Sequence, residues 1–168
     1  MLLLIGLGAN LGDRHGALQW AAGRMAERFR WRIGSQIFAT AALGPRQADF
    51  LNAAALVEAD DHPLRVLAFC QLLESEAGRD RRREKRWGPR LLDLDLLLAE
   101  GLVLASPALS LPHPRLHLRR FALAPAAQLV PHWLHPRVHR TMASLAGDPA
   151  LADQACEPTA GSLTPPFP

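Results

Sequence analysis

Apolar residues occur along the chain in short runs and in helically spaced sets, and the spacing within each block predicts its secondary structure. Short apolar or alternating runs bounded by Gly, Pro or Asp are typical of strands. The first, LLLIGLG, is nearly all apolar, as expected of a buried strand. The runs that predict strands are residues 2–8, 31–42, 51–59, 91–99 and 102–105.

Helices are predicted where apolar residues recur three and four positions apart. Asp13 can cap the first helix, and the apolar positions Leu18, Met25 and Phe29 then share one face of it. Pro63 suits the first turn of the second helix, and Gly78 is placed to end it. The predicted helices span residues 13–29, 60–77, 119–129 and about 139–146.

The order of these elements is β-α-β-β-α-β, followed by further helices. This order predicts an α+β fold, namely a ferredoxin-like βαββαβ sandwich with two helices on one face of an antiparallel sheet and extra C-terminal helices. No repeat or linker divides the chain, so we expect residues 1–155 to form a single domain. Residues 156–168 (CEPTAGSLTPPFP) are rich in proline and predict a disordered tail.

Composition indicates an ordinary globular protein: of 168 residues, 49% are hydrophobic and 21% are charged. No apolar run is long enough to span a bilayer, and the N-terminus lacks the basic region of a signal peptide. Cys70 and Cys156 belong to no metal or redox motif and are read as free thiols. We therefore expect a cytoplasmic protein with no membrane partner, working as a monomer.

Positive charge is concentrated in residues 79–90 (RDRRREKRWGPR). Six Arg and one Lys face two acidic residues there, a net charge of 7 − 2 = +5, so the rest of the chain carries 3 − 5 = −2. Arginine forks match phosphate oxygens in bidentate geometry. The segment alone suits a phosphate-bearing substrate or a nucleic acid equally well, and Trp87 could stack on a base.

Two aspartates follow this segment directly. On a strand, Asp93 and Asp95 project from the same face, roughly 6.5–7 Å apart along it, while the neighbouring leucines project from the other. Two carboxylates in an apolar strand repel each other unless a cation lies between them, and Mg²⁺ commonly uses one or two carboxylates plus substrate phosphates. Arginines beside a carboxylate pair favour phosphoryl transfer, which needs both, over nucleic-acid binding.

The segment RWGPRLLDLDLL (86–97) resembles the signature of the 6-hydroxymethyl-7,8-dihydropterin pyrophosphokinase family, whose fold is ferredoxin-like. The resemblance extends over about residues 2–136. Further matching segments are GANLG (8–12), LGP (43–45), DFLNA (49–53), the second helix and its exit (71–79) and the last motif (112–121).

By this resemblance the chain would be an ATP-dependent diphosphotransferase of folate biosynthesis, with ATP and a hydroxymethyl-dihydropterin as substrates and AMP as a product. Asp93 and Asp95 would hold two Mg²⁺ ions, and Arg86 and Arg90 would complete the catalytic set. Arg81 and Arg82 are alternatives for one phosphate contact. The residues expected beside ATP are Gln71, Glu74, Arg81, Arg82, Arg86, Arg90, Leu96, His113 and Arg119.

The resemblance also implies a pterin site. Phe50 and Phe121 would stack on the two faces of the pterin ring, and Asn52 would hydrogen-bond its amide-like edge. The residues expected around the pterin are Thr40, Leu43, Phe50, Asn52, Trp87 and Phe121.

Some positions depart from the family pattern. Ala41 and Ala42 stand where the family commonly has Pro, Leu91 replaces a frequent Thr, and Arg120 stands where Gly often precedes the stacking Phe. These departures leave open a divergent paralogue acting on a modified pterin.

Three other functions stay open at this point: a nucleic-acid-binding module using residues 79–90, a dinucleotide-binding turn at residues 6–12 (GLGANLG), and a zinc site. The glycines of the turn space as G-x-G-x-x-x-G, which departs from the dinucleotide fingerprint. A zinc site would use His132, His135 and His139, with no cysteine or acid nearby to complete it.

Overall fold

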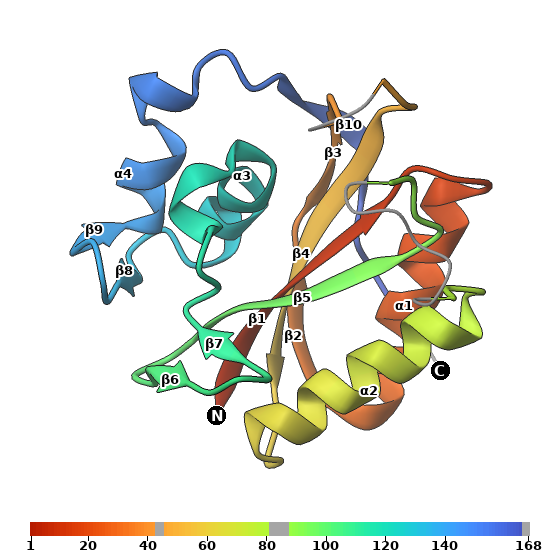
Figure 1. The fold of residues 1–168 in the computed structure, drawn as a ribbon, viewed down its shortest axis with the longest axis horizontal. Helices are drawn as coiled ribbons and strands as arrows, with labels where there is room; N and C mark the ends of the chain where they lie inside the picture. The colour runs from red at the N-terminus through yellow and green to blue at the C-terminus, as the bar shows by residue number, and fades with distance from the viewer. Residues whose placement is uncertain (43–45, 81–87, 166–168) are drawn as a thin grey trace.

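The protein, seen in a computed structural model that describes residues 1–42, 46–80 and 88–165, is built around one antiparallel sheet (Figure 1). Its strands follow the order β10-β3-β4-β1-β5, and β2 also pairs with β4. Every pair of neighbouring strands described in this sheet is antiparallel. The strands are β1 (Leu2–Ala9), β2 (Arg30–Gly34), β3 (Gln36–Thr40), β4 (Phe50–Glu58), β5 (Asp93–Ala99) and β10 (Cys156–Ser162).

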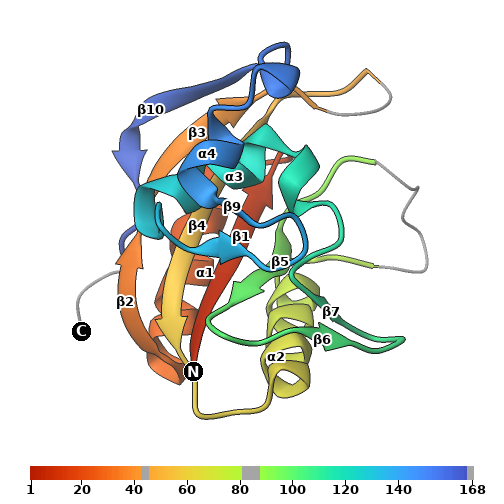
Figure 2. The ribbon, with the colours of Figure 1, turned by 90° about the vertical axis from the view of Figure 1, so that its left-hand side faces the viewer.

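Helices cover both faces of this sheet. Helices α1 (Arg14–Arg28) and α2 (Pro63–Glu76) lie on one face, and α3 (Arg120–Leu129) and α4 (Met142–Ala146) lie on the other (Figures 1 and 2). Alternate positions of β1 serve the two layers, because Leu3, Ile5 and Leu7 pack under α1 and α2 while Leu4 packs under α3. A mixed α/β architecture with an antiparallel sheet is therefore confirmed.

The remaining elements are short. Two hairpins, β6 (Leu104–Ala105) with β7 (Ser110–Leu111) and β8 (Leu134–His135) with β9 (Arg140–Thr141), flank α3 in the sequence. Two 3₁₀ turns span Leu116–Leu118 and Pro149–Leu151. No helix in the described ranges combines the length and hydrophobicity that crossing a bilayer requires.

The ends of the first two helices match the sequence signals. The Asp13 side chain accepts a hydrogen bond from the backbone N–H of Gly16, 2.9 Å away, and so caps α1. Pro63 occupies the first turn of α2. Gly78 follows that helix with a φ of +97°, a conformation that favours glycine.

Residues 31–42, predicted as one strand, form two strands. Ser35 separates them. Its backbone N–H donates to the carbonyl of Ala54, and its hydroxyl accepts a hydrogen bond from the N–H of Ala54; each bond is 2.9 Å long. Both β2 and β3 consequently pair with β4, on either side of this point. The predicted helix at 139–146 is also shorter, because Arg140 and Thr141 form β9 and Thr141 caps α4.

The expectation of a disordered tail from residue 156 is wrong for the described part of it. Cys156–Ser162 forms β10, which pairs with β3 at the edge of the sheet, where Pro158 is tolerated. Beyond the strand, Leu163 is fully buried under α1, and its N–H donates a hydrogen bond to the Ser35 carbonyl at 2.8 Å. The Gln19 side chain, which donates to the Ser162 carbonyl and accepts from the Thr164 N–H, fixes the segment on both sides of Leu163.

Leu163→Ala is therefore expected to lower the free energy of unfolding by about 2–5 kcal/mol, the usual cost of truncating a buried leucine. Leu134→Ala is the matched control, because Leu134 is 59% exposed and its truncation should change stability by less than about 0.5 kcal/mol. Urea denaturation of both variants measures the difference. Equal effects would show that residue 163 is not packed in the core.

Candidate active site

A pocket of about 510 Å³ opens on the α3 side of the sheet and extends past the edge of β5 toward α2. Its floor is bare because two glycines of β1 face it: Gly6 pairs with Asp95 and Gly8 pairs with Asp93. A Cβ atom at Gly8 would lie 2.7 Å from Oδ1 of Asn52, and one at Gly6 would lie 3.0 Å from Leu97. Glycine at these two positions lets neighbouring side chains lie across β1.

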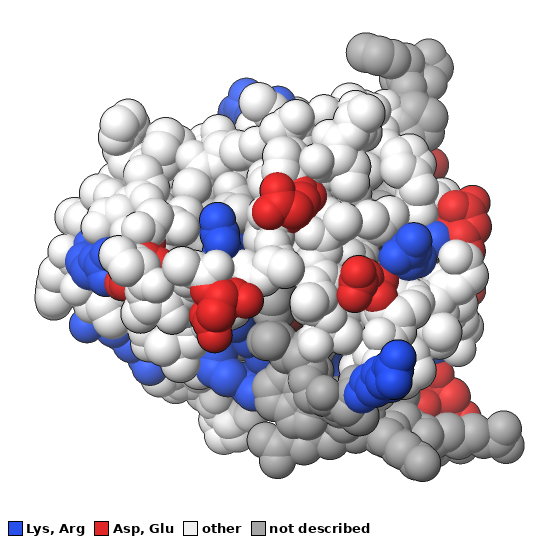
Figure 3. Space-filling view, turned by 90° about the horizontal axis from the view of Figure 1, so that it is seen from above, with Lys and Arg blue, Asp and Glu red and all other residues white. Residues whose placement is uncertain are grey.

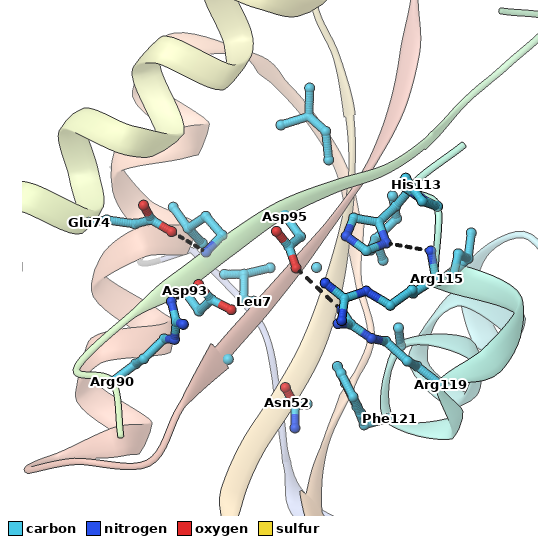
Figure 4. Close-up of a pocket in the computed structure, with 18 of the residues that line it drawn as sticks. Leu7, Asn52, Glu74, Arg90, Asp93, Asp95, His113, Arg115, Arg119 and Phe121 are labelled. Carbon is cyan, nitrogen blue, oxygen red and sulfur yellow. Dashed lines mark hydrogen bonds and ion pairs between the residues drawn. The ribbon is translucent and has the colours of Figure 1, made fainter. Parts of the chain in front are cut away.

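Asp93 and Asp95 project from the pocket face of β5, and the leucines between and beside them pack in the opposite layer, as the alternation predicts (Figure 4). Strand geometry thus brings two carboxylates to the same wall of one pocket. Their surroundings differ, however, and this difference sets their electrostatics.

Asp93 is held by two arginines. Oδ1 of Asp93 accepts hydrogen bonds from Nη1 of Arg79 at 2.7 Å and from Nη1 of Arg90 at 3.2 Å. The same nitrogen of Arg79 donates to Glu74, whose side chain is only 1% exposed and also accepts from the N–H of Leu94 at 2.8 Å. Glu74 and Arg79 form a buried ion pair that fixes the position of Asp93.

The negative charge of Asp95 has a more distant arginine partner than that of Asp93. Its nearest described cation is Arg119, with Nη1 of Arg119 4.0 Å from Oδ2 of Asp95. Although 40% of the Asp95 side chain opens to the pocket, the carboxylate lies deep in the protein, and this burial together with the Asp93 charge raises its pKa to about 6. Burial and the neighbouring like charge thus make the ionised form of Asp95 costly in this pocket.

His113 lines the same wall as a neutral group. Burial and the charges of Arg119 and Arg115 lower its pKa to about 4. Its Nδ1 accepts from the N–H of Arg115 at 3.1 Å, so the ring proton of the neutral imidazole is on Nε2. The backbone N–H of His113 donates to the Leu97 carbonyl at 2.7 Å, which holds the residue against β5.

The other end of the pocket is aromatic and amide-lined. Asn52 on β4 donates to the hydroxyl of Thr40 on β3 at 2.7 Å, and both side chains are largely buried. Phe50 from β4 and Phe121 from α3 line this end as well. The guanidinium carbon of Arg119 lies 5.4 Å from the centre of the Phe121 ring, which links the aromatic end to the charged end.

Asn10 ties together two segments that border the pocket. Its Oδ1 accepts from the N–H of Arg90 at 2.6 Å, and its Nδ2 donates to Gln47 and to the carbonyl of Ala48, both at 3.0 Å. Only 2% of Asn10 is exposed. The end of β1 thus holds both the segment that leads into Phe50 and the segment that leads into Asp93.

Most of the residues singled out in the sequence line this single pocket. Two of them are almost fully buried. Glu74 is 1% exposed and bonds to Arg79, and Leu96 is 2% exposed and packs in the core under α1 and α2. The remaining members that the pocket brings together are Thr40, Phe50, Asn52, Gln71, Arg90, Asp93, Asp95, His113, Arg119 and Phe121. Those that lie outside the described residues are Leu43, Arg81, Arg82, Arg86 and Trp87.

Several residues that line or border the pocket were not assigned a role from the sequence. Arg79 is one of seven cations in the basic segment, and nothing in the sequence marks it as a partner of Glu74 and Asp93. Asn10 and Gln47 act through partners far away in the chain. Gly6 and Gly8 signal a close approach only once the strand register is known.

Two of the rival functions fit the structure less well, whereas residues 81–87, on which the nucleic-acid hypothesis mainly depends, lie outside the described residues. The described sheet is antiparallel, whereas a dinucleotide-binding turn belongs to a parallel one. Within the described ranges no group of three or more His, Cys, Asp or Glu side chains could hold a metal ion, so the suggested site of His132, His135 and His139 is not formed. On the face seen in Figure 3, the described basic and acidic side chains are interspersed and do not form one extended basic surface.

Comparison with known proteins adds an independent finding. The family model described as 7,8-dihydro-6-hydroxymethylpterin-pyrophosphokinase (HPPK) matches residues 4–131. Proteins named 2-amino-4-hydroxy-6-hydroxymethyldihydropteridine pyrophosphokinase are similar to the chain. The one from Bacillus subtilis is 38% identical over 128 residues, or 74% of this chain and 75% of that protein. The one from Synechocystis sp. is 33% identical over 144 residues, which cover 84% of this chain and 73% of that protein.

Solved structures resemble the fold. A crystal structure described as HPPK-DHPS in complex with substrates superposes with a TM-score of 0.65 over 86% of this chain, at 11% identity. Plasmodium falciparum HPPK-DHPS gives a TM-score of 0.61 at 13% identity. The chain spans 42% and 43% of those two chains, and at such identities the likeness concerns the fold alone.

The raised pKa of Asp95 predicts that the metal-free protein loses stability as the pH rises from about 4 to about 6. An unfolded aspartate titrates near 3.9, whereas Asp95 in the folded protein titrates near 6, so between these values the folded state holds the extra proton and folding weakens with rising pH. Asp95→Asn should therefore raise the melting temperature at pH 8 in EDTA by about 2–4 °C, allowing for solvent screening, and leave it unchanged at pH 4.

Asp93→Asn is the matched comparison for this measurement. It removes the negative charge that pairs with two arginines and leaves only an amide oxygen to accept from them, so its melting temperature at pH 8 should fall. Melting curves of both variants at pH 4 and pH 8 decide the matter. An equal rise in the melting temperature of both variants at pH 8 would mean that the two carboxylates are electrostatically equivalent.

Proposed function

Since the chain belongs to the 7,8-dihydro-6-hydroxymethylpterin-pyrophosphokinase family, we propose that the pocket above β1 and β5 is where it carries out the family reaction. That reaction transfers pyrophosphate from ATP to 6-hydroxymethyl-7,8-dihydropterin in folate biosynthesis and releases AMP. The observation that carries this assignment to the pocket is the pair Asp93 and Asp95, open to a space whose other end is aromatic.

The carboxylate pair suits magnesium. Mg²⁺ prefers oxygen ligands, and the glycine floor leaves both carboxylates uncovered. Burial first, and the charge of Asp93 second, raise the pKa of Asp95, so a cation bound there would stabilise its ionised form. The two bonds from arginine to Asp93 end on one oxygen, Oδ1, so among the described residues its Oδ2 is left for a cation. Asp93 and Asp95 would hold two Mg²⁺ ions, which would neutralise charge on the ATP phosphates.

Cationic and neutral donors flank this pair on the phosphate side. Arg90 and Arg119 stand on opposite sides of the two carboxylates, and both line the pocket. His113, neutral with its proton on Nε2, would donate a hydrogen bond to a phosphate oxygen at any pH well above 4. Arg81 or Arg82, together with Arg86, would add contacts from the basic segment, as the family resemblance implies.

The pterin would occupy the opposite end. Phe50 and Phe121 would stack on its two faces, and Asn52 would bind its amide-like edge with one amide group while the Nδ2 donation to Thr40 keeps that amide oriented. Leu43 and Trp87 would complete this end. Gln71 lies on the α2 side, where the nucleotide would extend.

In the chemical step, the hydroxymethyl oxygen of the pterin attacks the β-phosphorus of ATP in line. The bond from that oxygen to the β-phosphorus forms, the bond from the β-phosphorus to the oxygen of the α-phosphate breaks, and AMP leaves. The hydroxyl proton passes to solvent. No described side chain is placed as an obvious base, so the protein contributes mainly by positioning both substrates and balancing phosphate charge.

Two finer features complete the proposal. The strand order β5-β1-β4-β3, with α1 and α2 on one face, supports a ferredoxin-like βαββαβ frame with added C-terminal elements. We also propose that the chain acts as a monomer in the cytoplasm, where ATP is available and Cys70 and Cys156 stay reduced.

The direct test is product analysis with ATP, Mg²⁺ and 6-hydroxymethyl-7,8-dihydropterin. The proposed reaction releases AMP and the pterin diphosphate, whereas a simple kinase would release ADP. Asp93→Asn and Asp95→Asn should each lower turnover at least about 100-fold, since each removes a metal ligand. Asp60→Asn is the control, because the Asp60 side chain is 90% exposed and does not line the pocket. Near-normal turnover in either pocket variant would refute the metal assignment.

Phe121→Ala tests the pterin end. Losing one stacking face should weaken pterin binding about tenfold or more, while ATP affinity alone should change little. Phe69→Ala is the matched control, since Phe69 is also partly buried but pairs with Phe29 in the other layer and does not line the pocket. Calorimetric titration of each ligand, with a melting curve of the same sample, measures both effects. Unchanged pterin affinity in a stable Phe121→Ala protein would refute the stacking role.

A further inference from the structure

Helix α3 starts at the pocket but does not cap itself. Arg119 is the N-cap residue and Phe121 lies in the first turn, and both line the pocket. The first N–H groups of a helix lack partners within the helix, and they are usually satisfied by a side chain at the N-cap. The Arg119 side chain makes no such bond, so the turn that carries two pocket residues depends on an outside partner.

That partner is Gln154, more than thirty positions further along the chain. Its Oε1 accepts from the N–H of Arg120 at 2.9 Å, and its Nε2 donates to the carbonyl of Leu118 at 3.1 Å. One amide therefore satisfies a donor at the start of α3 and an acceptor in the preceding 3₁₀ turn. The Arg120 guanidinium returns the contact by donating to the carbonyls of Ala152 and Gln154, at 3.4 and 3.3 Å.

Gln154 is itself held on both sides. Its N–H donates to the carbonyl of the buried residue Leu151 at 3.1 Å. Two positions later Cys156 begins β10, where it is buried and pairs with Thr40. In Figure 1 this segment runs from α4 across to β10 beside β3. It thereby joins the Phe121 wall of the pocket to the wall that contains Thr40 and Asn52.

We propose that Gln154 is a positioning residue of the pocket, which sets the place of Arg119 and Phe121 by capping α3 from the C-terminal segment. The inference rests on the function proposed above for the same pocket. It also explains Arg120, which departs from the glycine frequent in the family at that position, because its side chain and its N–H both bind this segment.

The chain provides a matched control in Gln128, near the other end of α3. Its Oε1 accepts from the N–H of Gln36 at 2.9 Å and its Nε2 donates to Oε1 of Gln36 at 2.7 Å, so it too makes two long-range amide bonds between α3 and another segment. It does not line or adjoin the pocket. Replacing either glutamine by alanine removes two long-range side-chain hydrogen bonds, at the start of α3 for Gln154 and near its end for Gln128.

The experiment compares Gln154→Ala with Gln128→Ala in steady-state turnover, at a temperature where melting curves show both to be folded. Both variants should lose a similar 2–4 °C or so in melting temperature. Only Gln154→Ala should raise the pterin KM, by about fivefold or more, because small misplacements of binding groups are costly. Gln154→Glu, which keeps the acceptor for the Arg120 N–H, should stay within about threefold of the unsubstituted protein.

Hydrogen exchange gives a second reading that does not depend on turnover. The amides at the start of α3 should exchange faster in Gln154→Ala and at the normal rate in Gln128→Ala. If Gln154→Ala were unfolded at the assay temperature, Gln154→Asn, one methylene shorter, would be measured in its place with the same expectation.

The outcomes are separable. Equal pterin KM values in the Gln154 and Gln128 variants would overturn the positioning role, even if both lost stability. Absence of AMP release by the unsubstituted protein would instead overturn the proposed function. In that case the exchange rates alone would decide whether Gln154 holds the start of α3.

Discussion

Repulsion between the carboxylates of Asp93 and Asp95 is the constraint on which the pocket depends. The strand places them on one face, and burial strengthens their mutual effect. Nη1 of Arg79, which also pairs with the buried Glu74, donates to Asp93, while Arg119 stands 4.0 Å from Asp95. Asp93 therefore has close arginine partners, whereas burial and the Asp93 charge raise the pKa of Asp95. A carboxylate whose ionised form is costly in this way suits the metal ions of the proposed reaction.

Space is the second requirement, and glycine provides it. The run LLLIGLG has the apolar character of a central strand, but on the pocket face its last positions carry no side chain. Asn52 can then lie across Gly8, where a Cβ atom would come within 2.7 Å of its Oδ1, and Leu97 can pack closely across Gly6. The same stretch thus has two functions, since its odd positions build the core under α1 and α2 while Gly6 and Gly8 leave the carboxylates open.

Local patterns account for much of this structure. The alternation at 93–97 predicts the shared face of the two aspartates, and the capping signals at Asp13, Pro63 and Gly78 mark the helix ends correctly. The failures share one cause, which is a long-range partner. The hydrogen bonds between Ser35 and Ala54 divide the predicted strand in two. Strand β10 contains Pro158 and Gly161, yet it is ordered because it pairs with β3 and leads into the core. The role of Arg79 could not be predicted either, because it depends on burial beside Glu74, a contact that the local sequence does not signal.

Charged groups and neutral amides have different roles around the pocket. In the proposed reaction, the charged groups would change their balance when phosphates and metal ions bind. Neutral amides also join distant segments around the pocket, through the side chains of Asn10, Asn52 and Gln154. A primary amide both donates and accepts, and it has no proton to lose or gain between acid and neutral pH. Its hydrogen bonds therefore keep their strength while the charge in the pocket changes. Such bonds can hold Arg90, Phe50 and the start of α3 in place through binding and release.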